Sequence, residues 1–589
     1  MNNRGWEQVD FVLVTGDAYV DHHSFGTAII SRFLEKAGYK VGILPRPDYT
    51  NVEDFRRFGK PRLGFLINSG VVDSMVNNYS VFKHKRKFDD YAPKAARENP
   101  KLDPGRPDRA VIVYTNKAKE AYKDVPVIIG GLEASLRRFA HYDYWSNKIR
   151  RSILLDSKAD LLIYGMGERA ILEIVDALNQ GLNAKDITWV NGTVFRAKDG
   201  FLDDAIILPS FEDIQSSKEA YAHSFKIQNE NNDYINGKQL VEKYTDTVYV
   251  VQNPPQEPLN SQELDEVYQL PYENNWHPSY DALGGIPAFD EVKFSIVSSR
   301  GCFGGCTFCA LTYHQGRQVR GRSKHSIVHE AEKLTKLPDF KGYIHDIGGP
   351  TANFRGPACK KQLKAGVCKG KDCLYPTVCK NMDVDHLEYL DILKAVRALP
   401  KVKKVFIRSG IRYDYLLADK NCDLFIKELV GNHVSGTLKV APEHVSENVL
   451  YYMRKPAVDS FLSFSDKYFR ENKKQAKKQY LIPYLISSHP GSTLDDAIEL
   501  ALFLKNYGFV PDQVQDFYPT PGTLSTCMFY TEIDPYTGKK VYVAKDMEEK
   551  RMQRALIHFN KAENRKYVIK ALKKAGREDL IPVLLGNKR

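Results

Sequence analysis

One short loop, Ser299 to Cys309, constrains this chain more than any other feature of its sequence. It carries Cys302, Cys306 and Cys309 at a Cys-x3-Cys-x2-Cys spacing among glycines, directly after a strand-like apolar run. Glycine allows a backbone to wrap closely around a bound group. A structural zinc normally takes four ligands, whereas a 4Fe-4S cluster held by three thiolates keeps one iron open. The loop therefore predicts a metal or cluster site, and the alternatives are a partial zinc knuckle or buried thiols.

This spacing resembles the signature of the radical SAM enzymes, in which the open iron binds S-adenosylmethionine (SAM). The resemblance implies a 4Fe-4S cluster on Cys302, Cys306 and Cys309. It also implies reductive cleavage of SAM to a 5′-deoxyadenosyl radical and an electron donor of the flavodoxin or ferredoxin kind. We therefore expect an enzyme, although the sequence names no substrate and assigns no catalytic side chain.

The cysteine count, the net charge and the length of the apolar stretches indicate where such chemistry would take place and with which partners. The nine cysteines are an odd number and are clustered, which favours metal binding over disulfides. The net charge of +12 over 589 residues permits a nucleic-acid partner without demonstrating one. No stretch approaches the roughly 18 apolar residues that span a bilayer. We expect a cytoplasmic protein with no membrane partner.

The first part of the chain has the pattern of an α/β domain. From about Val9 to Leu182, short apolar runs such as Phe11–Thr15 and Leu161–Tyr164 alternate with helical stretches such as Thr27–Ala37. Buried strands interleaved with helices predict a doubly wound, Rossmann-like domain over residues 1–185. Ligands bind such folds at the carboxyl ends of the strands.

A histidine pair stands where the first strand ends. Residues 21–26, Asp-His-His-Ser-Phe-Gly, match the Asp-x-His-x-x-Gly pattern of cobalamin-binding domains, so His23 is the candidate cobalt ligand. Three fixed positions make a weak pattern, and Asp and His at such turns commonly serve as caps. The sequence therefore weighs against cobalamin and favours a cobalamin-domain-like fold with an empty or repurposed cleft.

The second half of the chain alternates strands and helices again. Six such units run from Val292–Val297 to Gln513–Phe517 and predict a partial (β/α)6 barrel over residues 289–545. Between the two domains, residues 186–288 are rich in proline and are predicted to form a connector and arm. Residues 546–589 are predicted to form a helical C-terminal tail.

Several strand ends of the predicted barrel carry residues suited to SAM. Gly348-Gly349-Pro350 follows the second strand, where radical SAM proteins often have a Gly-Gly-Glu-like turn that holds the SAM amino group. Ser409 follows the third strand and Glu443 the fourth. Because the carboxyl ends of barrel strands meet on one rim, we expect Gly348, Gly349, Ser409 and Glu443 to contact SAM.

A second cysteine group lies in an insertion, residues 355–382, of the predicted barrel. Cys359, Cys368, Cys373 and Cys379 fall within this segment, which lacks apolar periodicity. No Cys-x2-Cys pair is present, which weakens a zinc interpretation. A second iron–sulfur cluster, zinc and redox-active or free thiols all remain open.

Taken together, the motifs resemble the YgiQ family of radical SAM proteins, which join a cobalamin-domain-like region to a radical SAM core. The segments that carry the resemblance are residues 20–26, 130–138, 302–309, 346–353, 408–414 and 441–444. The family supplies no settled substrate. Two alternatives to a radical SAM enzyme of unknown substrate stay open: an RNA-modifying enzyme that transfers methylthio or methyl groups, and a non-catalytic iron–sulfur or cobalamin-type sensor.

Overall fold

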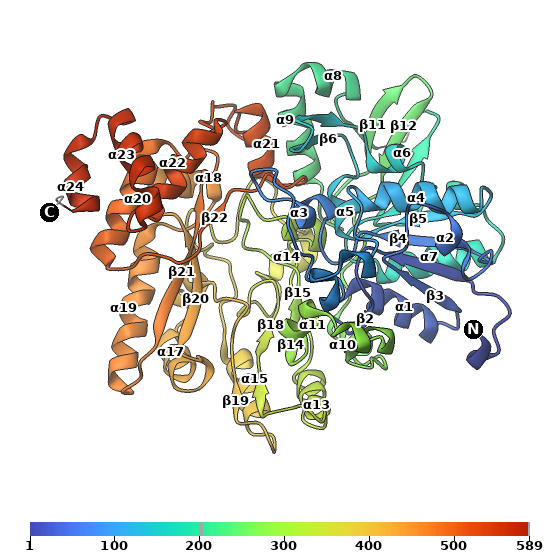
Figure 1. Ribbon diagram of the computed structural model, residues 1–589, viewed down its shortest axis with the longest axis horizontal. Coiled ribbons are helices and arrows are strands. Elements are labelled where there is room, and N and C mark those ends of the chain that lie inside the picture. Colours follow the sequence, from blue (N-terminus) through green and yellow to red (C-terminus); the bar gives the residue numbers. More distant parts are fainter. Residues whose placement is uncertain (200–203, 587–589) are drawn as a thin grey trace.

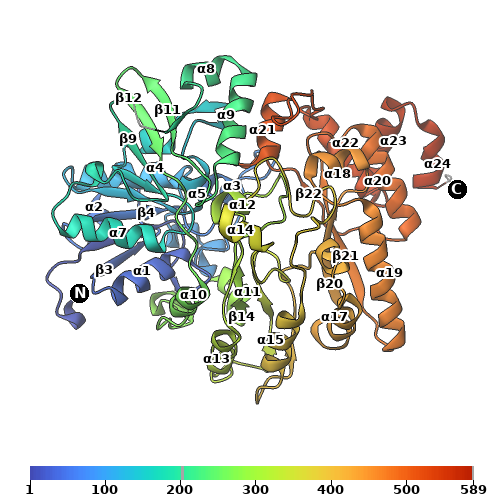
Figure 2. The same cartoon turned by 180° about the vertical axis from the view of Figure 1, so that it is seen from behind.

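The computed structural model describes residues 1–199 and 204–586. Residues 200–203 and 587–589, which fall within the predicted connector and C-terminal tail, lie outside the described part. Figures 1 and 2 show three regions side by side: an N-terminal α/β half, a central set of barrel strands, and a group of C-terminal helices at the far end.

The N-terminal half is built on a nine-stranded sheet in the order β10-β11-β12-β9-β8-β5-β4-β1-β3. In its parallel part, Leu13 of β1 lies beside Ile43 of β3 and Leu66 of β4. Nearly continuous apolar runs are typical of parallel strands that are covered on both faces. These strands are β1 (Phe11–Thr15), β3 (Val41–Pro45), β4 (Gly64–Asn68), β5 (Val127–Ile129) and β8 (Leu161–Ile163).

Helices cover both faces of this parallel sheet. Helices α1 (Gly26–Lys36) and α7 (Glu168–Asn179) contribute to the hydrophobic core on one face. Helices α4 (Ala110–Ala121) and α6 (Ile153–Ser157) contribute to the core on the other. The doubly wound fold class predicted from the sequence is therefore confirmed.

The predicted connector is corrected by the structure. Strands β9 (Thr193–Ala197), β10 (Ile206–Ile207), β11 (Leu240–Thr245) and β12 (Val248–Gln252) extend the N-terminal sheet. Strand β9 pairs antiparallel with β8, and β12 with β9. Because Val250 and its neighbour Val251 are fully buried in this sheet, the segment is part of the first domain up to about Gln252.

The second half contains the strands of a partial parallel barrel. Strand β14 (Ser295–Val297) pairs with β18 (Asp346–Gly348), and β17 (Tyr343–Ile344) with β19 (Lys404–Val405). Strands β20 (Thr437–Glu443), β21 (Tyr480–Ser487) and β22 (Gln515–Asp516) form a second parallel group. All six predicted strand positions are occupied, with strand two divided into β17 and β18 at His345.

The barrel helices and the C-terminal helices pack against these strands. Apolar residues of α13 (Lys324–Leu334), α15 (Leu387–Arg397) and α19 (Val458–Lys474) form one core with the barrel strands. Helices α20 (Leu494–Tyr507), α22 (Met547–Ile557), α23 (Arg565–Lys574) and α24 (Ile581–Leu585) form another. None of the described helices combines the length and the apolar character needed to cross a membrane.

The remaining helices and strands mostly connect or cap these layers. They are β2 (Val20–Asp21), β6 (His141–Asp143), β7 (Lys148–Arg150), β13 (Asn275–Trp276), β15 (Ser299–Arg300), β16 (Arg320–Gly321), α2 (Glu53–Arg56), α3 (Ser74–Asn78), α5 (Gly131–Leu136), α8 (Phe211–Ser216), α9 (Lys218–Glu230), α10 (Ser261–Tyr268), α11 (Pro287–Val292), α12 (Leu311–Gln315), α14 (Lys360–Ala365), α16 (Tyr413–Leu417), α17 (Cys422–Glu428), α18 (Glu447–Met453) and α21 (Leu524–Thr531).

Candidate functional site

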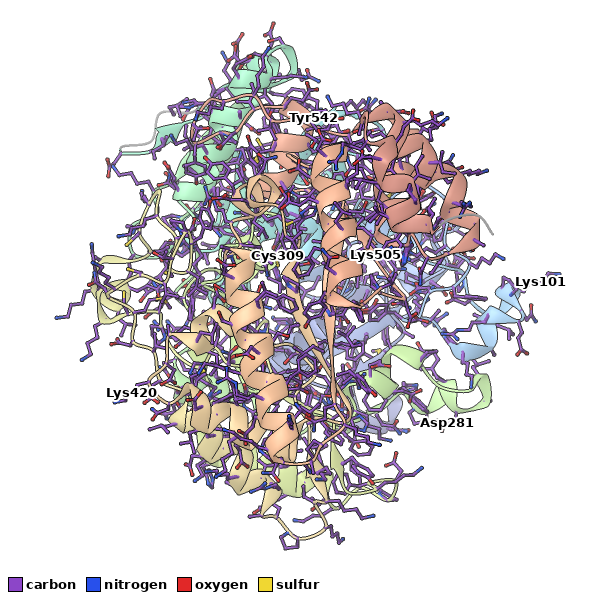
Figure 3. All side chains as sticks on the ribbon, turned by 90° about the vertical axis from the view of Figure 1, so that its left-hand side faces the viewer. Lys101, Asp281, Cys309, Lys420, Lys505 and Tyr542 are labelled. Atoms are coloured by element: carbon purple, nitrogen blue, oxygen red, sulfur yellow. The ribbon has the colours of Figure 1, made fainter. Side chains whose placement is uncertain are left out.

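The cysteine loop begins at the carboxyl end of β14 and β15, as the sequence predicted. The backbone N–H of Cys302 donates to the carbonyl of Gly316 at 3.1 Å, which closes the loop at its base. Gly301 has a φ of +84°, and a Cβ there would lie 2.9 Å from the carbonyl carbon of Gln318. Only glycine fits this turn without strain. Figure 3 places Cys309 near the middle of the molecule.

The three thiols of this loop lie close together. Burial raises the pKa of the Cys309 thiol to about 12, and the neighbouring Cys302 and Cys306 add to the rise. Within residues 1–199 and 204–586, no three His, Cys, Asp or Glu side chains converge tightly enough to hold one metal ion. A 4Fe-4S cluster bonds each thiolate to a different iron, so its ligands need not converge on one point. Cys302, Cys306 and Cys309 are thus the residues that would hold a 4Fe-4S cluster, with one iron left without a protein ligand.

An arginine that sequence reasoning missed lies beside this loop. The Nη1 of Arg412 donates to the Cys306 sulfur at 3.3 Å, and its Nε donates to Asp414 at 2.6 Å. The Nη2 is buried without a hydrogen-bond partner among the described residues. Arg412 comes seven residues after the end of strand β19. Its position beyond a strand end is the signal in the sequence that could have identified it. Its free N–H can donate to an anionic group beside the three thiols.

The predicted SAM residues Gly348, Gly349 and Ser409 come together on the barrel rim. They line a cavity of about 660 Å³ that lies between the barrel and the N-terminal domain. A Cβ on Gly349 would lie 2.6 Å from the hydroxyl oxygen of Ser299. That hydroxyl is buried and has no hydrogen-bond partner among the described residues. The rim therefore offers a narrow glycine surface and a free polar group to a ligand.

The fourth predicted SAM residue, Glu443, lies near Cys309 of the cysteine loop. Its carboxylate oxygen is 3.7 Å from the Nζ of Lys455, and its charge is one of those that raise the pKa of Cys309. Burial raises the pKa of Glu443 itself, against the charges of Lys455 and Arg412. Among the described residues that line the 660 Å³ cavity, Glu443 does not occur.

The candidate cobalt ligand, His23, also lines the cavity but its Nε2 is already engaged. It lies 2.7 Å from a carboxylate oxygen of Glu330 in α13 of the barrel half. The other oxygen of Glu330 accepts from Arg322 at 2.6 Å. Asp21, the first residue of the same motif, is paired with Arg32. Coordination of cobalt through the Nε2 of His23 would therefore require this hydrogen bond to break.

A narrow apolar slot opens from the same cavity into the N-terminal domain. Its volume is about 160 Å³, and it lies at the carboxyl ends of β1, β4, β5 and β8. A Cβ on Gly131, where φ is +77°, would lie 3.1 Å from the Cβ of Asn68. The slot and the cavity share several lining residues, namely Gly26, Ile29, Gly70, Gly131, Met166 and His314. The shared residues make the slot and the cavity one continuous space.

This combination of a doubly wound domain, a partial barrel and a three-thiol loop on the barrel rim defines a radical SAM protein. A family model described as "Radical SAM N-terminal" matches residues 1–295, and one described as "Domain of unknown function (DUF3362)" matches residues 512–587. A UPF0313 protein of Clostridium perfringens is 60% identical over 583 residues, which are 99% of this chain and 87% of that protein. One of Clostridium botulinum is 58% identical over 99% of this chain and 89% of that protein. The chain belongs to the UPF0313 family of radical SAM proteins.

A solved structure shares this fold. It is that of the cobalamin-dependent SAM radical enzyme OxsB with aqua-cobalamin and SAM bound, and it is 13% identical. The match covers 99% of this chain and 74% of that chain, with a TM-score of 0.51. The sequence weighed against cobalamin, and that prediction is wrong: the OxsB structure, whose fold this chain shares over 99% of its length, has cobalamin bound.

Proposed function

We propose that this chain is an enzyme that cleaves SAM reductively at a 4Fe-4S cluster held by Cys302, Cys306 and Cys309. The observation that carries the proposal is the gathering of three thiols on the barrel rim, with the Arg412 guanidinium 3.3 Å from the Cys306 sulfur. A cluster bound there would supply one electron for cleavage of SAM to methionine and a 5′-deoxyadenosyl radical. The family membership supports the same chemistry.

The chain's own residues have distinct tasks in this proposal. The glycine turn at Gly348 and Gly349 lets SAM approach the strand ends closely, and the Ser299 hydroxyl offers it a hydrogen bond. The free Nη2 of Arg412 attracts the SAM carboxylate toward the cluster. The rings of Phe303 and Phe354 stack with their centroids 3.8 Å apart. Cys302 packs against them, so they exclude water from that side of the loop. Glu443, which lies near Cys309, is retained as a fourth contact of SAM.

The cavity between the two halves supports a corrinoid as a second cofactor. Gly26, Gly131 and Gly165 line the slot and would let such a ligand approach the backbone closely. A corrinoid in this place would supply a methyl carrier within a space that the SAM rim also lines. Methyl transfer is therefore the second candidate function. His23 would serve as a cobalt ligand only after releasing Glu330.

The proposal includes the setting expected from the sequence. A low-potential cluster requires a one-electron donor, so we retain a flavodoxin-like or ferredoxin-like partner. A reducing compartment suits such a cluster, so we retain a cytoplasmic location. The resemblance to YgiQ proteins belongs to this proposal as well. Neither that resemblance nor the proposed SAM cleavage identifies the substrate class.

The test of SAM cleavage is the amount of 5′-deoxyadenosine formed after anaerobic reduction with SAM. The wild-type chain should form it, Cys306→Ala should not, and Cys422→Ala, a buried cysteine outside the loop, should behave as wild type. Absence of product from a wild-type chain that contains a full cluster would overturn the proposal.

The test of the corrinoid site compares two glycines that share a positive φ. Gly131 lies in the slot, whereas a Cβ on Gly181, where φ is +92°, would meet nothing within 4 Å. Gly131→Ala should reduce the corrinoid absorbance that elutes with the reconstituted protein, and Gly181→Ala should not. Equal absorbance in both variants would rule this slot out.

A further inference from the structure

The Cys-rich insertion holds four thiols that the proposed SAM chemistry does not use. Cys359, Cys368, Cys373 and Cys379 are free; Cys368 is exposed and the other three are half-buried. The segment has little regular structure beyond the short helix α14. A chain segment without apolar periodicity commonly takes its order from a bound metal group.

Backbone hydrogen bonds close this insertion into one compact loop. The N–H of Asp383 donates to the carbonyl of Ala358 at 3.0 Å, so the two ends of the segment meet beside Cys359. The N–H of Cys379 donates to the carbonyl of Cys373 at 2.8 Å. Three of the four cysteines therefore lie at or next to the two points where the loop is closed.

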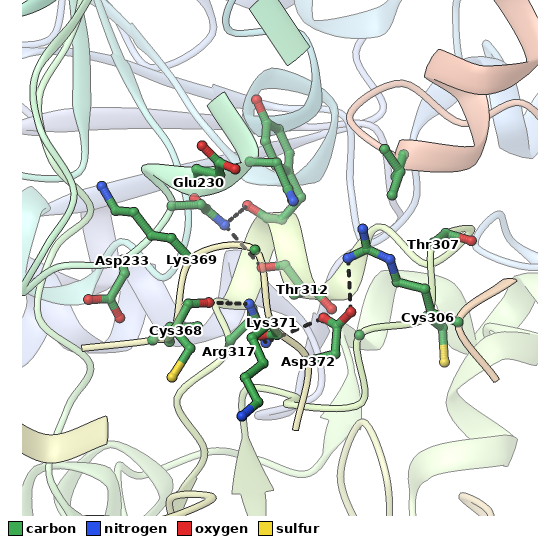
Figure 4. A pocket seen from close by; sticks show the side chains of 18 of the residues that line it. Glu230, Asp233, Cys306, Thr307, Thr312, Arg317, Cys368, Lys369, Lys371 and Asp372 are labelled. Atoms are coloured by element: carbon green, nitrogen blue, oxygen red, sulfur yellow. Dashed lines mark hydrogen bonds and ion pairs between the residues drawn. The ribbon is translucent and has the colours of Figure 1, made fainter. Parts of the chain in front are cut away.

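The fourth cysteine is fixed from the side of the barrel. Arg317 donates to the carbonyl of Cys368 at 3.3 Å and lies 3.5 Å from the carboxylate of Asp372. The same carboxylate pairs with Arg454 at 3.0 Å. Figure 4 shows Cys368 and Cys306 on opposite sides of this network of charged groups. The insertion is thus anchored between the barrel and the first cysteine loop.

The barrel also holds Cys368 beside the segment that leads into Cys373. Arg317, which binds the carbonyl of Cys368, donates to the carbonyl of Lys371 at 3.1 Å as well. Structural zinc sites commonly use Cys-x2-Cys pairs, and the insertion contains none. Four thiolates without such a pair suit a 4Fe-4S cluster.

One apolar cluster contacts both cysteine groups. Cys302 of the first group and Cys373 of the second both pack against it. Its members are Phe303, Val319, Phe354, Ala358, Leu374 and Tyr415, all of them buried. Side chains packed in this way shield both groups from water. Lysines on the outside of the insertion, at positions 360, 361, 364, 369, 371 and 380, supply positive charge beside an anionic group.

We propose that Cys359, Cys368, Cys373 and Cys379 ligate a second 4Fe-4S cluster. With four thiolates, every iron of this cluster is held by the protein, so no iron is open to SAM. The proposal is independent of SAM cleavage, because it concerns only what the insertion binds.

The test is the iron and sulfide content of the full-length chain after anaerobic reconstitution and desalting. The wild type should contain about eight irons, corresponding to two four-iron clusters. Replacement of Cys302, Cys306 and Cys309 by Ser should leave about four irons and a cluster signal in electron paramagnetic resonance that SAM does not alter. This variant leaves the insertion intact, so it tests the second site even if variants of the insertion fold poorly.

The reciprocal variant replaces Cys359, Cys368, Cys373 and Cys379 by Ser and should also retain about four irons, with a signal that SAM shifts. Cys422→Ser, outside both groups, should retain the wild-type content. The proposal is overturned if the triple variant of the first loop loses all iron, or if it binds one zinc in place of iron. A wild type with about four irons overturns it too, and leaves the first site unaffected.

Discussion

The Nε2 of His23 lies 2.7 Å from the Oε1 of Glu330, although the two residues belong to different halves of the molecule. Glu330 also accepts from Arg322 at 2.6 Å, and all three side chains are buried or nearly so. This buried network therefore ties the N-terminal domain to helix α13 of the barrel half. Breaking a buried ion pair by removing one partner costs roughly 3–5 kcal/mol.

The network should make stability depend on pH in the acid range. Burial raises the pKa of Glu330, but the charges of Arg322 and then His23 outweigh it and leave the pKa at about 2. A carboxyl whose pKa is lower in the folded than in the unfolded chain stabilises the fold at pH values above its unfolded pKa. This contribution is lost as the pH falls toward 2. We expect the free energy of unfolding to fall by about 3 kcal/mol between pH 4.5 and pH 2 on this account.

Denaturant unfolding at several pH values checks this expectation. Glu330→Gln should be less stable at pH 7 and should show a flatter pH dependence than wild type. Glu332→Gln, on the exposed side of the same helix, should keep the wild-type slope. An unchanged slope in Glu330→Gln would contradict the assignment.

Arg412 should set the reduction potential of the cluster. Its guanidinium donates to the Cys306 sulfur, and such a charge stabilises the more negative, reduced state. A hydrogen bond to a charged group is worth roughly 1.5–3 kcal/mol. Only the part of this energy that differs between the two oxidation states shifts the potential, so roughly 65–130 mV for one electron is the upper limit. Arg412→Gln should lower the potential by up to that amount in a redox titration.

Two further variants make this result specific. Arg412→Gln combined with Asp414→Asn removes the carboxylate left without its partner and should show the same shift. Arg408→Gln removes an exposed arginine that pairs with Glu291 and should leave the potential unchanged. If Arg408→Gln shifts the potential equally, the effect is one of overall charge and not of the contact with Cys306.

The glycine turn should control SAM affinity. A Cβ on Gly348 would lie 2.8 Å from the Cβ of Ser409, so Gly348→Ala forces the rim to rearrange. We expect SAM to bind at least about tenfold more weakly, a loss of about 1.4 kcal/mol, with an unchanged iron content. Gly356→Ala, where a Cβ meets nothing within 4 Å, is the matched control in equilibrium dialysis. Wild-type affinity in Gly348→Ala would place SAM elsewhere.

A buried lysine should make the protein more stable at alkaline pH. Burial lowers the pKa of Lys550 to about 8, and its Nζ lies 4.9 Å from the centroid of the Phe529 ring. Between pH 8 and 10.5 the unfolded state binds more protons than the folded state, so stability rises with pH across that window. Lys550→Met should remove this slope and stabilise the fold at pH 7 by about 1–2 kcal/mol, after the lost cation–π contact is counted.

Thermal unfolding at pH 7 and at pH 10 measures both effects. Lys566→Met removes an exposed lysine that also lies over a ring, that of Tyr567, and should change stability by less than about 0.5 kcal/mol. A destabilised Lys550→Met would show that its contacts outweigh the cost of burying its charge.

Local features of the sequence predicted the cysteine loop and the six barrel strands, because spacing and apolar periodicity act over a few residues. Strands β9 to β12 were missed because antiparallel pairing depends on partners such as β8 that adjoin only in the folded sheet. Arg412 was missed for a similar reason, since its contact with Cys306 spans 106 residues. Glu443 was placed on the correct strand, but neither its φ of +67° nor its contact with Lys455 could be read from the sequence.

The cavity between the two halves has a consequence for the order of biosynthesis. Its walls run from His23 in the first domain to Tyr484 on β21, so they come from nearly the whole length of the chain. During synthesis the N-terminal domain generally folds first. The slot of the first domain is therefore exposed to solvent until the later strands have been translated. A cofactor that fills this space can be enclosed only after most of the protein has been made.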